Sequence, residues 1–340
     1  MFVRSILNVR PRAICCVLFL ICCLCDVHAG NRLKRLWTRI DSLLAERYYK
    51  THYDTNYVAR PDGKLTLKLK VNQTGNSLHA KGTINDVWSR ADLKTSYKTT
   101  ISIGAAYRGI AASYAINPAK LGGSYNDYEL NISYYGSRLS LDASYQKSTS
   151  MLGSIQRNGT SRMEAGDVTM KVYNVAAYYC FNHRKFSFPA AFNQSYIQRR
   201  SAGSWLAGIS YQGGRIETRE ELKARNPNAP DVSIKAGHLG IGGGYGYNLV
   251  LGRKWLLHLS LLPTFVVYNH NKLTINGESR HSHHMHFNMI FNERAAVICN
   301  ISPRWFTGAT LVMSNSVFDD KAVVVNQNKW VARAFVGMRL

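Results

Sequence analysis

The stretch YELNISYYGSRLSLDASYQK, residues 128–147, contains the pattern that decides the fold. Every second side chain of residues 128–135 is apolar, and the same alternation returns in residues 139–146. Gly136 and Ser137 lie in the short joint between the two runs. A period of two residues is that of a β-strand with two different faces. The stretch therefore predicts two paired strands with one apolar and one polar face.

The connections between such runs alternate in length along the whole chain. The short joints are Arg108-Gly109, Gly136-Ser137, Leu251-Gly252 and Ser302-Pro303. The long polar joints are residues 73–96, 118–126, 148–167, 213–233, 268–284 and 315–327. Short turns at one end and long loops at the other are typical of an up-and-down barrel in an outer membrane.

The pattern predicts an all-β protein, a transmembrane antiparallel up-and-down β-barrel of about twelve strands, with ten to fourteen as alternatives. The strands are expected near residues 64–72, 97–107, 109–117, 127–135, 138–147, 168–181, 202–213, 234–249, 253–267, 285–300, 303–315 and 328–340. Two places do not fit this scheme. Residues 182–201 form a long connection at the short-turn end, and Glu293 falls on an apolar face, which suggests a bulge or an additional turn at 292–294.

Alternation alone also describes a soluble sandwich, which buries its apolar face. Three features favour the membrane. Aromatic residues gather at the strand ends, Tyr107, Tyr134, Tyr135, Tyr178, Tyr179, Trp205, Trp255 and Trp305 on the short-turn side, and Tyr268 and Trp330 on the other. The chain ends inside a strand, Trp330 to Leu340, which resembles the signal read by outer-membrane barrel-assembly machinery. Closure into a barrel also removes the exposed edges that lipid does not tolerate.

The composition agrees with an exported β-protein that attracts anions. Hydrophobic residues make up 46% of the chain, yet no run after residue 30 approaches the ~18 apolar residues of a membrane helix. The formal net charge is +23. This excess favours anionic outer-membrane lipid, lipopolysaccharide phosphates or acidic solutes as partners. No nucleic-acid-binding signature is found, so nucleic acid is not expected as a partner.

The N-terminus has the pattern of an export signal. A positive flank and the apolar run 13–24 lead to Val27-His28-Ala29, which predicts a signal peptide at residues 1–29. Lipidation at Cys22, Cys23 or Cys25 is the alternative. Residues 30–60 are expected to form a periplasmic amphipathic helix and an extended lead-in, and residues 61–340 the barrel. The expected location is the cell outer membrane, reached through the periplasm.

Several segments together resemble a Bacteroidetes family known as domain of unknown function 4421. The similar segments, in chain order, are Tyr53–Val58 with Pro61, Leu65–Val71, Tyr107–Ile110, Ile116–Pro118, Ser133–Gly136 and Arg199–Ser204. The resemblance covers most of the mature chain. It implies an exported, outer-membrane protein of unassigned activity and brings no catalytic residue with it.

A histidine tract is the first candidate site. His281, His283, His284 and His286 lie within six residues in or beside a long loop. Neutral imidazoles bind zinc, copper or nickel. No nearby Cys completes a ligand set, so a solvated loop that becomes cationic in mild acid is the favoured interpretation. We assign no metal and no other cofactor.

The interior of the barrel is the second candidate site. Gly240, Gly242, Gly244 and Gly246 give one strand a nearly bare inward face, with room for an inward-folded loop, a plug helix or a ligand. Lys68, Lys70, Lys98, Arg333 and Arg339 are expected to point into the lumen. They would line an anion-selective pore or, as we favour, pair with acids such as Glu129 and Asp142 and fill the interior.

The sequence therefore predicts an outer-membrane barrel that is not an enzyme. Its expected role is passive transport of small, anionic solutes, or a structural or binding role at the cell surface. A lipid-modifying barrel enzyme is one alternative, although no Gly-x-Ser-x-Gly elbow or paired carboxylates stand out. A secreted all-β binding module is the other alternative.

Overall fold

The computed structural model describes residues 53–340 except 64, 85–86, 108–109, 117–127, 157–158, 228–230, 283–285 and 320–322, and before them residues 35, 38–39, 41–43, 45–46 and 50. The predicted signal peptide lies outside the described residues. Arg35, Thr38, Arg39, residues 41–43, Ala45 and Glu46 are helical. No helix in the described part of the chain is long and apolar enough to cross a membrane.

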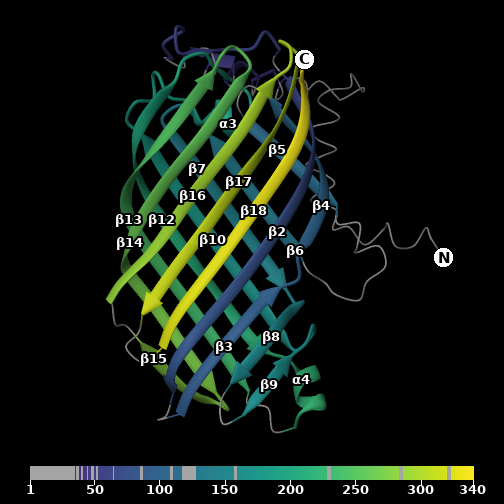
Figure 1. Cartoon of the computed structure of the whole chain (residues 1–340), viewed down its shortest axis with the longest axis vertical. Coiled ribbons are helices and arrows are strands. Elements are labelled where there is room, and N and C mark those ends of the chain that lie inside the picture. Colours follow the sequence, from purple (N-terminus) through teal and green to yellow (C-terminus); the bar gives the residue numbers. More distant parts are fainter. Residues whose placement is uncertain are drawn as a thin grey trace, which may run out of the picture.

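The strands curl into a closed antiparallel barrel (Figure 1). Within the described residues, twelve strands follow one another around the wall in chain order. They are β2 (Leu65–Ile84), β4 (Lys98–Tyr107), β5 (Ile110–Ile116), β6 (Tyr128–Tyr135), β7 (Leu139–Ser148), β10 (Val168–Cys180), β12 (Ala202–Thr218), β13 (Val232–Leu251), β14 (Trp255–Ile275), β16 (His286–Asn300), β17 (Trp305–Asp319) and β18 (Val323–Arg339). This confirms the predicted fold class and strand order.

The last strand closes the barrel against the first. β18 pairs with β2 from Arg339 opposite Thr66 to Val323 opposite Gly82. Leu340 and Leu65 exchange backbone hydrogen bonds of 2.7 and 3.0 Å at the end of this seam. The closed seam leaves no exposed strand edge at this point of the wall.

Several predicted long loops are in fact continuations of the strands. β2, expected to end at residue 72, runs on to Ile84, where β3 (Val87–Thr95) turns back beside it. β8 (Met151–Gln156), β9 (Thr160–Met163), α4 (Glu220–Arg225) and β15 (Glu278–Ser282) fill much of the other long connections. The contrast between the two faces is weaker in these extensions than in the rest of the wall: in the second half of β2 only Leu78 and Ile84 are large apolar residues.

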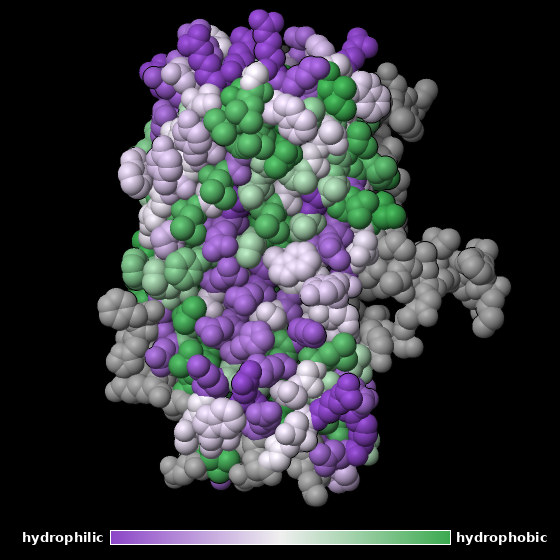
Figure 2. All heavy atoms as spheres, viewed as in Figure 1, coloured by the Kyte–Doolittle hydropathy of each residue, from purple (hydrophilic) through white to green (hydrophobic). Residues whose placement is uncertain are grey.

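The apolar faces of the strands point outward. Leu69 (51%), Ile103 (68%) and Leu259 (69%) are well exposed on the wall, while their strand neighbours Thr66, Ser102 and Ser260 are buried inside. Figure 2 shows hydrophobic side chains over the upper part of one face and hydrophilic ones gathered lower down. A barrel with an apolar outside and a polar inside is of the membrane-spanning type.

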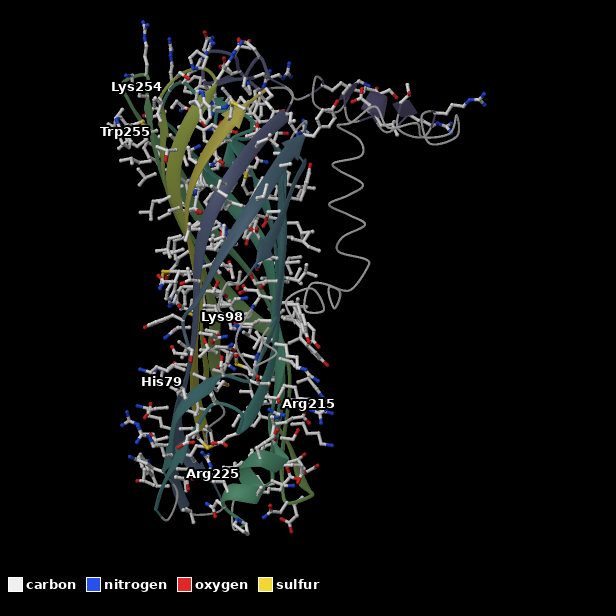
Figure 3. All side chains as sticks on the ribbon, turned by 90° about the vertical axis from the view of Figure 1, so that its right-hand side faces the viewer. His79, Lys98, Arg215, Arg225, Lys254 and Trp255 are labelled. Carbon is white, nitrogen blue, oxygen red and sulfur yellow. The ribbon has the colours of Figure 1, made fainter. Side chains whose placement is uncertain are left out.

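Aromatic side chains mark the two borders of the apolar band. Trp205, Trp255 and Trp305 are exposed near the short-turn end, where Figure 3 labels Trp255, and Tyr268 is exposed toward the other end. The prediction for Tyr135 and Tyr178 was wrong, because both face inward and are buried. Each is in phase with the polar side of its strand.

The strand around Glu293 is regular, so the expected bulge or turn at residues 292–294 was wrong. β16 keeps its register with β14 through Asn292, Glu293 and Arg294. Glu293 does face outward, half-buried, and its carboxylate accepts a hydrogen bond of 3.2 Å from Asn315 on β17. An amide from the neighbouring strand thus solvates this carboxylate on the wall.

A small lobe extends the long-loop end of the barrel. β3, β8, β9 and α4 lie there at the foot of Figure 1. Their core contains Leu93, Met151, Met163 and Leu222, packed with Leu78 and Met170 of the barrel. Ion pairs of Arg225 with Glu164 and Asp167 join α4 to the segment after β9.

Candidate functional site in the barrel lumen

Residues 182–201, which did not fit the strand scheme, fold into the short-turn end of the lumen. We call this segment the plug. It contains α3 (Phe188–Phe192), visible inside the upper barrel in Figure 1. Phe186, Phe188 and Ala191 are at most 1% exposed. Phe186 and Phe188 pack with wall residues such as Tyr178 and Leu206, and Ala191 lies in a second cluster with Leu256. The plug therefore closes this end of the lumen with an apolar core.

The plug sequence carries its own helix signal. The Ser187 hydroxyl accepts a hydrogen bond from the Ala190 amide as the N-cap of α3, and Pro189 occupies the first turn. A capping serine followed by proline is typical of a helix start. Gln194, just after the helix, adopts a positive φ of 56°, and its amide bonds to the Pro189 carbonyl. This signal could have identified the helix from the sequence.

Two predicted lumen cations hold the plug in place. The Lys68 ammonium on β2 donates hydrogen bonds of 3.0 Å to the Asn193 carbonyl and 2.7 Å to the Gln194 side-chain oxygen. Arg339 on β18 bonds to the Asn300 side chain at 2.8 Å and, at 3.4 Å, to the Gln194 carbonyl. These cations therefore bind the carbonyl-rich end of α3 and do not line a free pore.

A chain of buried polar side chains joins the plug to the opposite wall. Asn248 on β13 donates 3.0 Å hydrogen bonds to the Ser187 carbonyl and the Gln198 side chain. Its own side-chain oxygen lies 2.7 Å from Nδ1 of His258 on β14, and Nε2 of His258 lies 3.0 Å from the Ser260 hydroxyl. Phe188 and Phe192 of the plug cover the His258 ring, with centroids 5.2 and 5.0 Å away.

The lead-in before the barrel caps the plug from outside. β1 (Val58–Ala59) pairs with β11 (Ile197–Gln198) in the last part of the plug. The Tyr53 ring lies edge-on to Tyr196, 4.9 Å between centroids, and its hydroxyl lies 3.1 Å from that of Ser187. Two of the sequence segments that resembled the family, Tyr53–Val58 and Arg199–Ser204, therefore meet at this site.

The glycine face of β13 points inward, as predicted, and makes room for the plug. A Cβ on Gly246 would lie 3.1 Å from the Phe186 ring and 3.2 Å from the Ser260 Cβ. On Gly242 and Gly244 it would come within 2.0 Å of the carbonyl oxygens of Pro263 and Leu261 on β14. The absence of side chains on this face thus lets the plug and the backbone of β14 come close to β13.

A polar chamber lies in the lumen beside the plug. Its cavity volume is about 70 Å³, in a hollow that is partly open to solvent. Its polar lining comes from many strands: Asn131, Ser133, Asp142, Ser144, Asn174, Tyr178, Ser210, Gln212, Asn292, Arg294, Lys329 and Arg333. These residues are far apart in the sequence, so no local motif predicts the chamber.

Two ion-paired groups organise the chamber. Arg294 on β16 binds the Asp142 carboxylate on β7 at 2.7 Å and also the Tyr178 hydroxyl. The other Asp142 oxygen accepts a hydrogen bond of 2.7 Å from Tyr135. Lys329 on β18 lies 3.7 Å from Glu129 on β6 and donates to Ser144 at 3.0 Å. Glu129 and Asp142 thus pair with Lys329 and Arg294, which are not among the lumen cations that the sequence predicted as their partners.

Cations outnumber acids on the inner wall. The inner faces of the described barrel strands carry Lys68, Lys70, Lys98, Arg294, Lys329, Arg333 and Arg339 against Glu129 and Asp142. Figure 3 places Lys98 at mid-height in the barrel. Among the described residues, no carboxylate pairs with Lys70 or Arg333. The inner wall therefore has an uncompensated positive charge, which reaches the lining of the chamber at Arg333.

Some chamber side chains also have unused hydrogen-bonding capacity. The buried Nε of Arg294, Oδ1 of Asn174 and Oε1 of Gln212 have no partner in the described part of the chain. Buried polar groups of this kind are normally satisfied by water or a bound solute. The chamber is thus suited to a hydrated polar occupant.

The histidine tract lies mostly outside the described residues. His283 and His284 are not described, and of His281 and His286 only the backbone is, in β15 and β16. Elsewhere in the described chain, no group of three His, Cys, Asp or Glu side chains is arranged to hold a metal ion.

The closed antiparallel wall, its apolar outside and its polar interior define an integral outer-membrane type of β-barrel protein. The family model described as Domain of unknown function (DUF4421) matches residues 52–339, and the chain belongs to that family. A search of curated protein sequences finds no match.

Solved outer-membrane proteins resemble the chain in overall form. The outer membrane protease OmpT from Escherichia coli has a TM-score of 0.47 and 8% identity, covering 82% of this chain and 97% of that one. OprG from Pseudomonas aeruginosa has a TM-score of 0.30 and 8% identity, covering 83% and 98%. The translocator domain of the autotransporter NalP from Neisseria meningitidis has 0.31 and 8%, covering 93% and 100%. We draw no functional argument from these likenesses.

Proposed function

We propose that the protein is exported through the periplasm to the outer membrane. There it forms a barrel that binds small anionic solutes in its lumen chamber. The plug faces the periplasm and keeps the barrel from acting as an open pore. The carrying observation is the excess of lumen cations, above all Lys70 and Arg333, for which the described residues supply no carboxylate. Cations in a confined, low-dielectric space attract anions strongly.

Passage of the solute into the periplasm would require the plug to move. The plug is held by hydrogen bonds to Lys68, Arg339 and Asn248 and by apolar packing against the wall, and both would have to be broken. A binding role at the cell surface needs no such movement. The closed form therefore favours binding first and gated passage second.

The direct test measures the equilibrium binding of inorganic phosphate to the purified barrel in detergent by isothermal titration calorimetry. Lys70→Gln with Arg333→Gln should weaken phosphate binding at least tenfold. Arg253→Gln with Lys254→Gln, two exposed cations in the turn before β14, should leave it unchanged. Equal binding by both pairs of variants, or none by the parent protein, would refute the anion chamber.

Assembly is expected to begin at the C-terminal strand. β18 is the seam strand, paired on both sides, and it ends in the apolar Leu340. We propose that barrel-assembly machinery recognises this strand before it pairs with β2. Deletion of residues 338–340 should then lower the amount of heat-modifiable barrel in outer membranes without lowering its synthesis.

A second candidate function is hydrolysis at Ser260. A hydroxyl, an imidazole and an amide that could orient the imidazole form a hydrogen-bonded series in space: Ser260, His258 and Asn248. Nucleophilic catalysis requires such a series. Against it, Ser260 and His258 are each only 3% exposed beneath the plug. A serine-directed fluorophosphonate would discriminate. If a variant with a displaced plug is labelled and its Ser260→Ala form is not, the hydrolase is supported.

A further inference from the structure

One side of the outer wall carries a continuous row of cations. Five neighbouring strands, β7, β10, β12, β13 and β14, contribute one residue each: Lys147, Lys171, Arg215, Lys235 and Lys272. Each stands directly opposite the next in the sheet register. We call this set the cation row. Figure 3 labels Arg215 on the wall between the levels of Lys98 and Arg225.

The cation row forms the border of the apolar band toward the long-loop end of the barrel. On β7 the outward residues before Lys147 are Leu139, Leu141, Ala143 and Tyr145. On β13 the outward residues from Leu251 to Gly237 likewise include no Lys, Arg, Asp or Glu before Lys235. The same holds for the other three strands. The row is therefore where the wall passes from hydrocarbon to the charged surface of the leaflet.

Aromatic rings lie next to the row on its short-turn side. Tyr145 and Tyr173, one outward position nearer the short turns than Lys147 and Lys171, have ring centroids 5.0 Å apart. On β12 and β13 the corresponding outward positions are Gly213 and Gly237, and the Tyr211 ring covers both. A Cβ on Gly213 would lie 2.7 Å from the Tyr211 hydroxyl, and one on Gly237 would lie 3.0 Å from it. Tyrosine is enriched at the level of lipid headgroups. The tyrosines thus fix the depth at which the cations sit.

The row is nearly uncompensated within the protein. Arg215 pairs with Glu217, two residues along its own strand. For Lys147, Lys171, Lys235 and Lys272 the described residues provide no ion pair. Like charges directly opposite one another destabilise a sheet. Four consecutive repulsive pairs therefore call for anions supplied from outside the chain.

The other side of the wall shows that the row is local. On β17 and β18 the outward position that follows the apolar residues toward the long-loop end holds Asn315 opposite Asn328. Amides can bond to sugars and water but do not neutralise phosphate. The unbroken row of cations is therefore not continued on these two strands.

We propose that the cation row binds the phosphate groups of lipopolysaccharide in the outer leaflet. Ammonium and guanidinium groups spaced by one strand form charge-assisted hydrogen bonds to phosphate oxygens. The tyrosines on the short-turn side of the row contact the sugar and the part of the acyl chains nearest to it. β15 continues the register, with His281 opposite Lys272. This site lies on the outer wall and does not depend on the lumen chamber.

The test compares binding of lipid A to the full-length barrel in mixed detergent micelles. The row variant is Lys147→Gln, Lys171→Gln, Lys235→Gln and Lys272→Gln. The control variant removes four exposed cations from the short turns: Arg138→Gln, Arg253→Gln, Lys254→Gln and Arg304→Gln. Heat-modifiable gel migration verifies that both fold. The row variant should bind lipid A at least tenfold more weakly, and the control variant within twofold of the parent.

Three outcomes would overturn the proposal. The first is equal loss in the row and control variants. The second is equal binding of lipid A and its dephosphorylated form by the parent protein. The third is full competition by millimolar inorganic phosphate, which would indicate a site for free anions. Unchanged lipid A binding by the Lys70→Gln, Arg333→Gln variant would support it and separate this site from the chamber.

Discussion

The Lys68 ammonium group lies 2.7 Å from the side-chain oxygen of Gln194 and 3.0 Å from the carbonyl of Asn193. A charged group on the wall thus holds the far end of the plug helix, although 126 residues separate Lys68 and Gln194 in sequence. Both side chains are buried, so neither can exchange its partner for water. This contact joins the first strand of the barrel to the closure of its lumen.

Replacement of Lys68 by methionine should loosen the plug. The substitution keeps the length of the side chain but leaves the Asn193 and Gln194 oxygens without their donor, and unpaired buried acceptors are costly. Cys180, 1% exposed within the plug core, provides a natural reporter. In a Cys299→Ser background, the labelling rate of Cys180 by a small maleimide should rise at least tenfold. An unchanged rate would show that Lys68 does not retain the plug.

The glycine face offers a steric test of the same closure. Gly246→Val should push against Phe186 and displace the plug, because even a Cβ there lies 3.1 Å from that ring. Gly243→Ala is the matched control, since its outward Cβ meets nothing closer than 3.4 Å. Thiol labelling of Cys180 should increase in the valine variant alone. Equal labelling of the two variants would contradict the placement of Phe186.

The strands were predictable because lipid imposes contrast on them. Wherever one face meets hydrocarbon, as in residues 139–146, apolar and polar side chains alternate and the strand can be recognised. The sequence predicts a loop for the second half of β2, from Ser77 to Ile84, because only Leu78 and Ile84 mark an apolar face there and Ala80 and Gly82 give little contrast. The prediction that Tyr135 and Tyr178 lie in the outer aromatic belt was wrong. Aromatic residues occur both in such belts and in interior cores, so the residue type alone does not distinguish the two places.

The site was predictable only in part. The inward direction of Lys68, Lys70, Arg333 and the glycines followed from alternation alone. The plug did not, because its signal is not an alternation of two faces but a local helix start, Ser187 followed by Pro189. The contacts of Lys68 with Gln194 and of Arg294 with Asp142 join residues more than a hundred positions apart, and only the curvature of the sheet brings them together.

Removal of Arg294 should destabilise the barrel strongly. Arg294→Met leaves the Asp142 carboxylate in the chamber without its cation, and breaking a buried pair typically costs about 3–5 kcal/mol. The urea midpoint for loss of heat-modifiable migration should fall clearly. Arg294→Met with Asp142→Asn should recover part of the loss, because no charge is then left unpaired. A double variant as unstable as the single one would argue against the pair.

The lobe at the long-loop end should loosen in acid before the barrel does. The Lys223 side chain, 3.3 Å from Asp231, lowers the pKa of that carboxyl from its ordinary 3.8 by hydrogen bonding and charge, and Thr218 assists. A lowered folded-state pKa contributes stability above the ordinary value and loses it as the pH falls through the folded value. Hydrogen exchange of residues 219–226, corrected for intrinsic rates, should therefore accelerate below about pH 4.

Lys223→Ala is the matched variant for this acid response. Without the ammonium group the pKa of Asp231 returns toward its ordinary value, so exchange should be faster at neutral pH and depend less on pH. An acid response that persists unchanged in Lys223→Ala would place its origin elsewhere in the lobe.

Single-channel recording in planar bilayers tests the closed, cationic lumen most directly. The parent protein should show no steady conductance. A variant lacking residues 187–195, the helix and its wall contacts, should conduct, with a reversal potential under a salt gradient that indicates preference for anions. Steady conductance by the parent protein, or cation preference in the deletion variant, would contradict the account.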